Sequence, residues 1–239
     1  MKRFALISPA AALALGLAGC GGDLSLPGPT PGGVSLAVLQ GDGQTGTVGQ
    51  PLPSPVVVVV RTGEGVPMPD RLVVFVDSAT NATDAFDPDT VVTNPQGQAL
   101  THWVLGTTPG PYAAVATVIP QSDTIVPASI NASAVAGAPD SVRAAGPTIQ
   151  TGHRGQPVDE PLVVGVVDRF GNPVAGVEVR WKVESGNGSL SPSEGTVTDA
   201  DGHSSVAWTL GTRIGVQQAT AEVKDVIGSP VTFSATVPF

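Results

Sequence analysis

The chain repeats itself after about 105 residues, and this internal repeat limits its possible folds more than any other feature. Gly49-Gln50-Pro51 returns as Gly155-Gln156-Pro157, and the WVLGT sequence at 103–107 returns as WTLGT at 208–212. A near-constant offset over several motifs indicates two related domains of ordinary size. We therefore expect domains at 34–137 and 138–239. The connection at residues 136–139 is too short for free tumbling of one domain against the other.

Each repeat alternates apolar and polar residues as half-buried β-strands do. Between residues 177 and 184, every second side chain is apolar and each intervening side chain is charged. The side chains that this pattern predicts to face a core are Val177, Val179, Trp181 and Val183. A helix would scatter the charges around its circumference, so the segment predicts a strand.

The same alternation marks further strands in both repeats. In the second repeat it predicts core positions at Val206, Trp208, Leu210, Ala219, Ala221 and Val223. In the first repeat the corresponding positions are Val73, Phe75, Trp103, Leu105, Ala114, Ala116 and Val118. The five valines at 56–60 do not alternate, which predicts a strand that is buried on both faces.

Turn-forming residues separate these strands. Residues 169–173 (RFGNP) and 199–202 (DADG) are predicted turns of the second repeat, and residues 94–97 (NPQG) form the corresponding turn of the first. Short strands joined by turns, without a helical pattern, predict an all-β chain. We expect two tandem immunoglobulin-like β-sandwiches, each with about seven strands.

The second repeat resembles the group 1 bacterial Ig-like domain, the module that is stacked in intimin and invasin. The motifs that carry this resemblance are GQP at 155–157, VDRFGNPVAGV at 167–177, TDADG at 198–202 and WTLGT at 208–212. The first repeat departs from the pattern, so we expect a family search to find only the second. The resemblance implies an Ig-like fold, an extracellular location and a spacer role, and it transfers no adhesion residue to this chain.

The amino terminus has the three parts of a secretory signal peptide, which we place at residues 1–19. A basic pair precedes an apolar run at 4–18 that is too short to span a bilayer. Residues 17–20 (LAGC) resemble a bacterial lipobox, which implies cleavage between Gly19 and Cys20 and a lipid on Cys20. The alternative is an ordinary signal peptide with an incidental cysteine. The lipobox is favoured because Cys20 is the only cysteine and has no disulfide partner within the chain.

Residues 20–33 would then be the lipidated cysteine and a flexible Pro/Gly linker, in which the dozen residues 22–33 reach at most about 40 Å when extended. After cleavage, nine basic residues oppose twenty acidic ones, so the net charge is 9 − 20 = −11. This charge repels nucleic acid and anionic lipid headgroups. We expect a secreted protein of the bacterial envelope, anchored to the outer membrane or cell surface through the lipid on Cys20, without a nucleic-acid partner.

The sequence predicts no catalytic residue, no metal ligand, no cofactor and no small-molecule substrate. None of the histidines recurs at the same place in both repeats or has metal-ligand spacing; they are His102, His153 and His203. We interpret His102 as lying on the outward face of a strand and His203 as lying beside a turn.

Two acidic pairs are interpreted as parts of loops and turns. Asp199 and Asp201 resemble the start of a calcium loop, but position twelve of that loop would be Leu210 instead of Glu. The sequence therefore favours a β-turn, although a weak calcium site between the domains stays open. Asp87 and Asp89 are interpreted as solvated loop residues.

The aromatic residues divide into two groups. The alternation around Trp103, Trp181 and Trp208 favours core packing over stacking against a carbohydrate. Phe170, at a predicted turn, and Tyr112, near a strand start, are better candidates for exposed contacts.

Three functions remain as hypotheses. The leading one is a non-enzymatic surface spacer or adhesion module that contacts a surface protein or polysaccharide through loops and strand edges. The alternative is a dedicated binding module for a glycan or envelope polymer, which loses support if Trp181 and Trp208 are buried. An enzyme would require His153 or His203 to meet a carboxylate and a nucleophile across a cleft.

Overall fold

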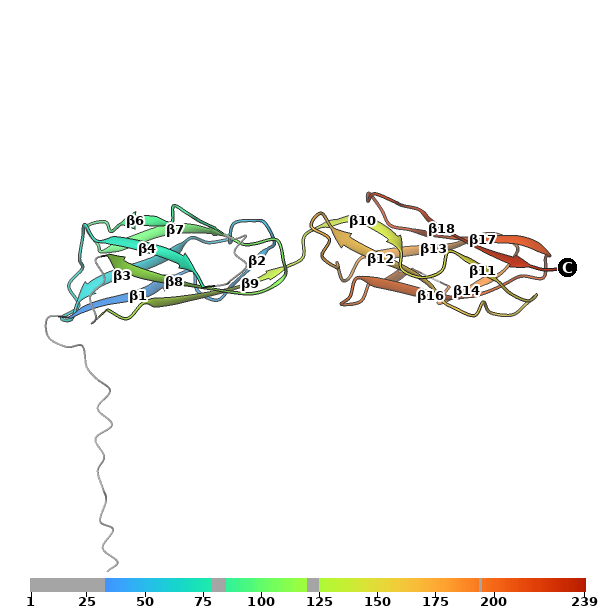
Figure 1. Cartoon of the computed structure of the whole chain (residues 1–239), viewed down its shortest axis with the longest axis horizontal. Helices are drawn as coiled ribbons and strands as arrows, with labels where there is room; N and C mark the ends of the chain where they lie inside the picture. Colours follow the sequence, from blue (N-terminus) through green and yellow to red (C-terminus); the bar gives the residue numbers. More distant parts are fainter. Residues whose placement is uncertain (1–32, 79–84, 120–124, 194) are drawn as a thin grey trace, which may run out of the picture.

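The computed structural model describes residues 33–78, 85–119, 125–193 and 195–239, and it contains two β-sandwiches arranged end to end (Figure 1). The predicted signal peptide, with Gly19 and Cys20, lies outside these residues. No described segment forms a helix that is long and apolar enough to cross a bilayer. The first strand begins at the far end of one sandwich and the chain ends at the far end of the other (Figure 1).

The first domain consists of two facing sheets. Its strands are β1 (Val34–Gln40), β2 (Gln44–Thr47), β3 (Val56–Thr62), β4 (Leu72–Asp77), β5 (Ala85–Asp87), β6 (Thr90–Val92), β7 (Gln98–Val104), β8 (Gly110–Ile119) and β9 (Ala128–Val135). The strand orders are β1-β3-β7-β5 and β2-β9-β8-β4-β6. The pairing of β2 with β9 is parallel, whereas the neighbouring β8–β9 and β4–β8 pairings are antiparallel.

The second domain repeats this arrangement strand for strand. Its strands are β10 (Pro139–Ala144), β11 (Ile149–Thr151), β12 (Leu162–Asp168), β13 (Glu178–Ser185), β14 (Ser189–Ser191), β15 (Thr196–Val197), β16 (His203–Thr209), β17 (Gly215–Glu222) and β18 (Val231–Val237). The orders are β10-β12-β16-β14 and β11-β18-β17-β13-β15. Here β11 runs parallel to β18, as β2 does to β9.

The expectation of tandem Ig-like sandwiches is confirmed, but the expected strand number was too low. In the described residues each domain has nine strands instead of about seven. The additional strands include the edge strands β5, β6, β14 and β15, which are only two or three residues long. A segment of that length is too short to display a period of two, so the sequence pattern does not reveal it.

Each domain has its own hydrophobic core. Trp103 and Trp208 occupy equivalent positions and are both 0% exposed, while Trp181 is 7% exposed. All five valines at 56–60 are buried, which confirms that this strand is covered on both faces. Of the predicted inward positions, Val177 and Val183 are half-buried and the remainder are buried.

The turns before β7 and β16 are built alike. The Asn94 Oδ1 atom accepts hydrogen bonds from the backbone N–H groups of Gln96 and Gln98, at 3.0 and 2.9 Å. The Asp199 Oδ1 atom accepts the corresponding bonds from Asp201 and His203, at 3.0 and 2.9 Å. Asp199 therefore stabilises a turn through its own backbone neighbours, as the sequence favoured.

Candidate functional site: the domain junction

The turn between β12 and β13 faces the first domain and is organised by Asp168, the last residue of β12. Asp168 is 2% exposed. Its Oδ1 atom accepts hydrogen bonds from the backbone N–H groups of Phe170 and Asn172, both at 2.9 Å. The backbone N–H of Gly171 donates to the Asp168 carbonyl oxygen at 2.9 Å. The aspartate thus fixes the shape of the turn that carries Arg169 and Phe170.

The second carboxylate oxygen of Asp168 fixes the connection between the domains. It accepts a hydrogen bond from the backbone N–H of Gly137 and another from the Asn172 side-chain amide, both at 2.9 Å. The Asn172 amide also donates to the carbonyl oxygen of Thr107, in the first domain, at 2.8 Å. One buried carboxylate and one amide therefore link the turn, the connecting segment and the neighbouring domain.

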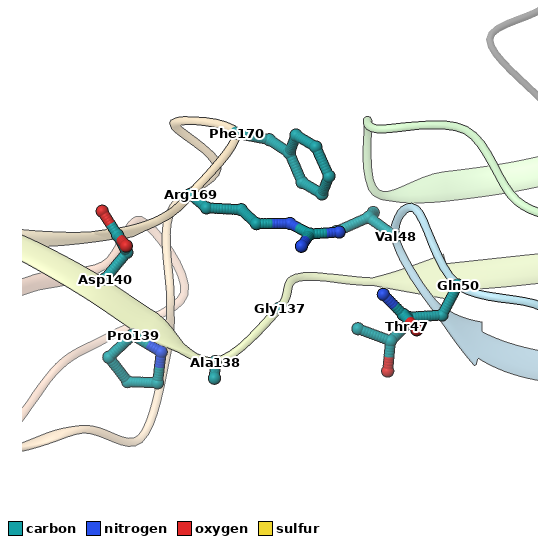
Figure 2. Close-up of a pocket in the computed structure, with 9 residues that line it drawn as sticks. All are labelled: Thr47, Val48, Gln50, Gly137, Ala138, Pro139, Asp140, Arg169 and Phe170. Carbon is teal, nitrogen blue, oxygen red and sulfur yellow. The ribbon is translucent and has the colours of Figure 1, made fainter.

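Arg169 and Phe170 extend from the second domain toward the first (Figure 2). The Arg169 guanidinium carbon lies 4.5 Å from the centroid of the Phe170 ring, which is a cation–π distance. Both side chains lie close to Gly49, because a Cβ atom added there would be 2.6 Å from Phe170 Cζ and 3.2 Å from Arg169 Nη2. Gly49 therefore allows the aromatic ring to approach the backbone of the first domain.

A cavity of about 290 Å³ lies at this junction. Its lining comes from the first domain, the connecting segment and the β12–β13 turn: Thr47, Val48, Gln50, Gly137, Ala138, Pro139, Asp140, Arg169 and Phe170 (Figure 2). The junction is thus a contact with some unfilled space beside the hydrogen bonds of Asp168 and Asn172.

The environment of Asp168 keeps its carboxyl group ionised. Burial raises its pKa, but the hydrogen bonds from the Asn172 side chain and from the backbone of Gly137, Asn172 and Phe170 lower it by more. The pKa therefore lies below its ordinary value. Protonation of this group would weaken the hydrogen bonds that hold the turn and the connection together.

The residues considered as catalytic or metal-binding lie apart in the fold. His102 is exposed on β7 of the first domain, His203 is exposed at the start of β16, and His153 is exposed in the loop after β11. Asp87 and Asp89 are exposed around β5 and β6. Within the described ranges, no group of three His, Cys, Asp or Glu side chains could hold a metal ion.

The aromatic candidates have different outcomes. Trp103, Trp181 and Trp208 are core residues, as the alternation predicted. Phe170 is 38% exposed and belongs to the junction. The prediction of an exposed contact was wrong for Tyr112, which is half-buried. Its ring lies edge-on to Trp103 at 6.5 Å and its hydroxyl donates to the Thr108 carbonyl oxygen at 2.8 Å.

Sequence reasoning identified the RFGNP segment as a turn but missed the roles of Asp168, Asn172 and Thr107. A signal was present, since the second repeat has an acidic residue before this turn and the first repeat has Thr62 there. The identity of the partner atom, a carbonyl oxygen 65 residues earlier, could not be read from the sequence.

Residues 160–236 match the family model of the bacterial Ig-like domain (group 1). The match lies in the second repeat. This confirms the expectation that a family search finds the second repeat and not the more divergent first repeat. No curated protein matches the chain significantly.

Solved structures of bacterial adhesins are similar to the chain. The Escherichia coli adhesin FdeC has a TM-score of 0.53 and 14% identity, and the similarity covers 87% of this chain and 65% of that chain. InvD of Yersinia pseudotuberculosis has a TM-score of 0.45, 17% identity and coverages of 85% and 57%. The D0-D1 domain of intimin has a TM-score of 0.33, 20% identity and coverages of 84% and 94%. The chain thus spans slightly under two-thirds of the FdeC structure, and that similarity establishes the fold.

Proposed function

Because its second domain is a group 1 bacterial Ig-like domain, we propose that the chain is a non-enzymatic protein of the bacterial cell surface. In this proposal the two domains form a rigid spacer of the adhesion type. The observation that carries it is the junction, where Asp168 and Asn172 connect the turn, the connecting segment and the first domain through hydrogen bonds. A spacer needs a fixed angle between its domains, and these contacts restrict that angle.

The proposed anchor is a lipid on Cys20, after removal of residues 1–19. The LAGC sequence at 17–20 and the Pro/Gly-rich linker that follows it support this assignment. The acyl chains would hold the protein at the membrane because each buried CH₂ group contributes about 0.8 kcal/mol. The first domain would lie nearer the membrane and the second domain farther out, in contact with a surface protein or polysaccharide.

The rigidity of the junction is testable by small-angle X-ray scattering on the chain from residue 21 onward. We expect wild type to scatter as an elongated particle with a narrow range of interdomain angles. Replacing both Phe170 and Asn172 by Ala should broaden that range. The matched control replaces Glu64 and Val66 by Ala, in the corresponding turn at the free end of the first domain, and should leave the scattering unchanged. The same broad range of interdomain angles in all three proteins would contradict the spacer.

The anchor and the partner need separate experiments. Labelled palmitate should be incorporated into wild type and not into Cys20→Ser, which should be released from the membrane fraction. For the partner, the chain from residue 21 onward is coupled to beads and exposed to envelope polysaccharides and to cell surfaces. Saturable retention of one component would support adhesion, whereas no retention by folded protein would leave a spacer without a binding role.

The alternative of a dedicated glycan-binding module has less support. Sugar-binding faces use exposed aromatic rings, but Trp181 and Trp208 are buried in the second core. Phe170, which is partly exposed, lies against Gly49 at the junction.

A further inference from the structure

The outer face of β4, β6 and β8 in the first domain is uncharged and mostly aliphatic, with Thr90 and Thr117 on either side of Val74. Six aliphatic side chains project from it, away from the core: Leu72, Val74, Val76, Val92, Val115 and Ile119. They are neighbours in the sheet, since Leu72 pairs with both Ile119 and Val92, and Val76 pairs with Val115. Val92 is 55% exposed and Val76 is 48% exposed. None of the six belongs to the buried core cluster.

The same face of the second domain is charged along β13, and its exposed aliphatic side chain on β15 is Val197, at the position of Val92. Glu178, Arg180 and Lys182 on β13 stand where the first domain has Leu72, Val74 and Val76 on β4. Charged side chains pair along this face, with Arg180 bonded to Glu178 at 3.1 Å and Lys182 to Glu184 at 2.9 Å. The fold therefore does not need an apolar surface here. The aliphatic face of the first domain calls for an explanation other than folding.

We propose that this apolar face is the contact surface between two copies of the chain. The chain has a net charge of −9, or 9 − 20 = −11 without residues 1–19, so two copies can pack together only where like charges do not oppose each other. Every outward position of β4, β6 and β8 is uncharged. The face also lacks aromatic and cationic side chains, which sugars and anionic lipids require. Flat sheet faces of this kind pack on each other about 10 Å apart.

The orientation and strength of the contact follow from the geometry. A two-fold axis parallel to the strands would place both amino-terminal ends on the same side. That arrangement suits two copies in one membrane, and this part of the inference rests on the proposed anchor. Three strands about 4.8 Å apart offer only a few hundred Å² per copy, below the roughly 800 Å² per partner of a stable complex. The dimer is therefore weak in solution and is strengthened by confinement to a surface.

The test exchanges the two faces on the chain from residue 21 onward. The triple variant Leu72→Glu, Val74→Arg, Val76→Lys gives β4 the residues that β13 carries at the same positions, so the fold should be retained. Sedimentation equilibrium up to roughly millimolar protein should show dimers of wild type and at least tenfold weaker association of the variant. The control Glu178→Leu, Arg180→Val, Lys182→Val changes the second domain and should not weaken dimerisation.

Cross-linking provides a second measurement that does not depend on the triple variant. The chain from residue 21 onward contains no cysteine, so a single cysteine can be placed at will. With a short bismaleimide, Val76→Cys should form dimers in much higher yield than Lys182→Cys, the equivalent position of the second domain. Equal collisional yields, or dimers that the triple variant does not weaken, would overturn the proposal. The proposal would also be overturned if the protein stayed monomeric and bound to lipid vesicles through this face in a flotation experiment.

Discussion

The β3–β4 turn of the first domain and the β12–β13 turn of the second have the same backbone and different roles. Gly65 N–H donates to the Thr62 carbonyl oxygen in one, and Gly171 N–H donates to the Asp168 carbonyl oxygen in the other, both at 2.9 Å. The Thr62 hydroxyl accepts from Val66 N–H at 3.2 Å, where the Asp168 carboxylate accepts from Asn172 N–H. The turn itself requires only an acceptor and a glycine.

The side chains added to this shared turn create the junction. The first domain has Thr62, Glu64 and Val66 at its free end, and the second has Asp168, Phe170 and Asn172 facing its neighbour. A second pair of positions shows the complementary difference. Gly49 and Gly155 have φ values of +66° and +67°, but only Gly49 has another domain against it. The comparison separates residues that specify the fold from residues that specify the contact.

The largest expected effect tests whether the two cores are independent. Trp208→Ala should destabilise the second domain by about 3–5 kcal/mol, because it removes a fully buried aromatic side chain. Trp103→Ala should do the same to the first domain. Denaturant titration, followed by far-ultraviolet circular dichroism because Trp103 is the first domain's only tryptophan, should show one weakened transition in each variant. If either variant lowers both transitions equally, the domains unfold as a single unit.

Asp168→Asn should have the next largest effect, about 3 kcal/mol, and Thr62→Val should cost less than 1 kcal/mol. The asparagine keeps one acceptor oxygen, but its NH₂ group would face the N–H of Gly137 and the Asn172 amide. Donors would then oppose donors in a buried site. Thermal unfolding of the two variants measures this difference. Equal losses would mean that the carboxylate contributes no more than the hydroxyl at the free end.

The stability of the second domain should also depend on pH through Asp168. Its folded pKa is lower than its unfolded value of about 3.9, so its contribution is present above that value. The contribution is lost as the pH falls through the lower folded pKa. The difference in melting temperature between wild type and Asp168→Asn should therefore shrink below about pH 4. A constant difference down to pH 2 would assign the stabilisation to another group.

Asn172→Ala should cost about 1 kcal/mol, because it removes the hydrogen bonds to Thr107 and Asp168. Val66→Ala at the free end should be nearly neutral, since Val66 is exposed. Chemical denaturation measures both losses, and scattering reports whether the interdomain angle changes. A loss of stability without a change in angle would place the role of Asn172 within its own domain.

The smallest expected difference lies between Gly49→Ala and Gly155→Ala. Both substitutions cost about 1–2 kcal/mol, because both glycines have positive φ. Only the first adds a Cβ atom against Phe170, and that ring can rotate away, so the extra cost is a few tenths of a kcal/mol. The difference should vanish in a Phe170→Ala background. A difference that persists there would point to Arg169 or to the backbone.

The sequence predicted those features that repeat or alternate. The equivalent tryptophans, the valines at 56–60 and the turns at 94–97 and 199–202 all follow from local patterns. The apolar face of the first domain was missed because Leu72–Val76 reads as one continuous apolar run. Its inward members, Val73 and Phe75, were recognised, whereas the outward members break the alternation. The contact of Asn172 with Thr107 depends on how two domains meet, which no local pattern encodes.

The parallel pairings described above have a mechanical consequence. Tension applied to the two ends of the described chain runs along the strands (Figure 1). It therefore loads the β2–β9 and β11–β18 ladders in shear, so that all their hydrogen bonds resist together instead of opening one after another. The two domains lie in series and carry the same force. The β2–β9 ladder pairs four positions and the β11–β18 ladder pairs three, so the second domain should yield before the first.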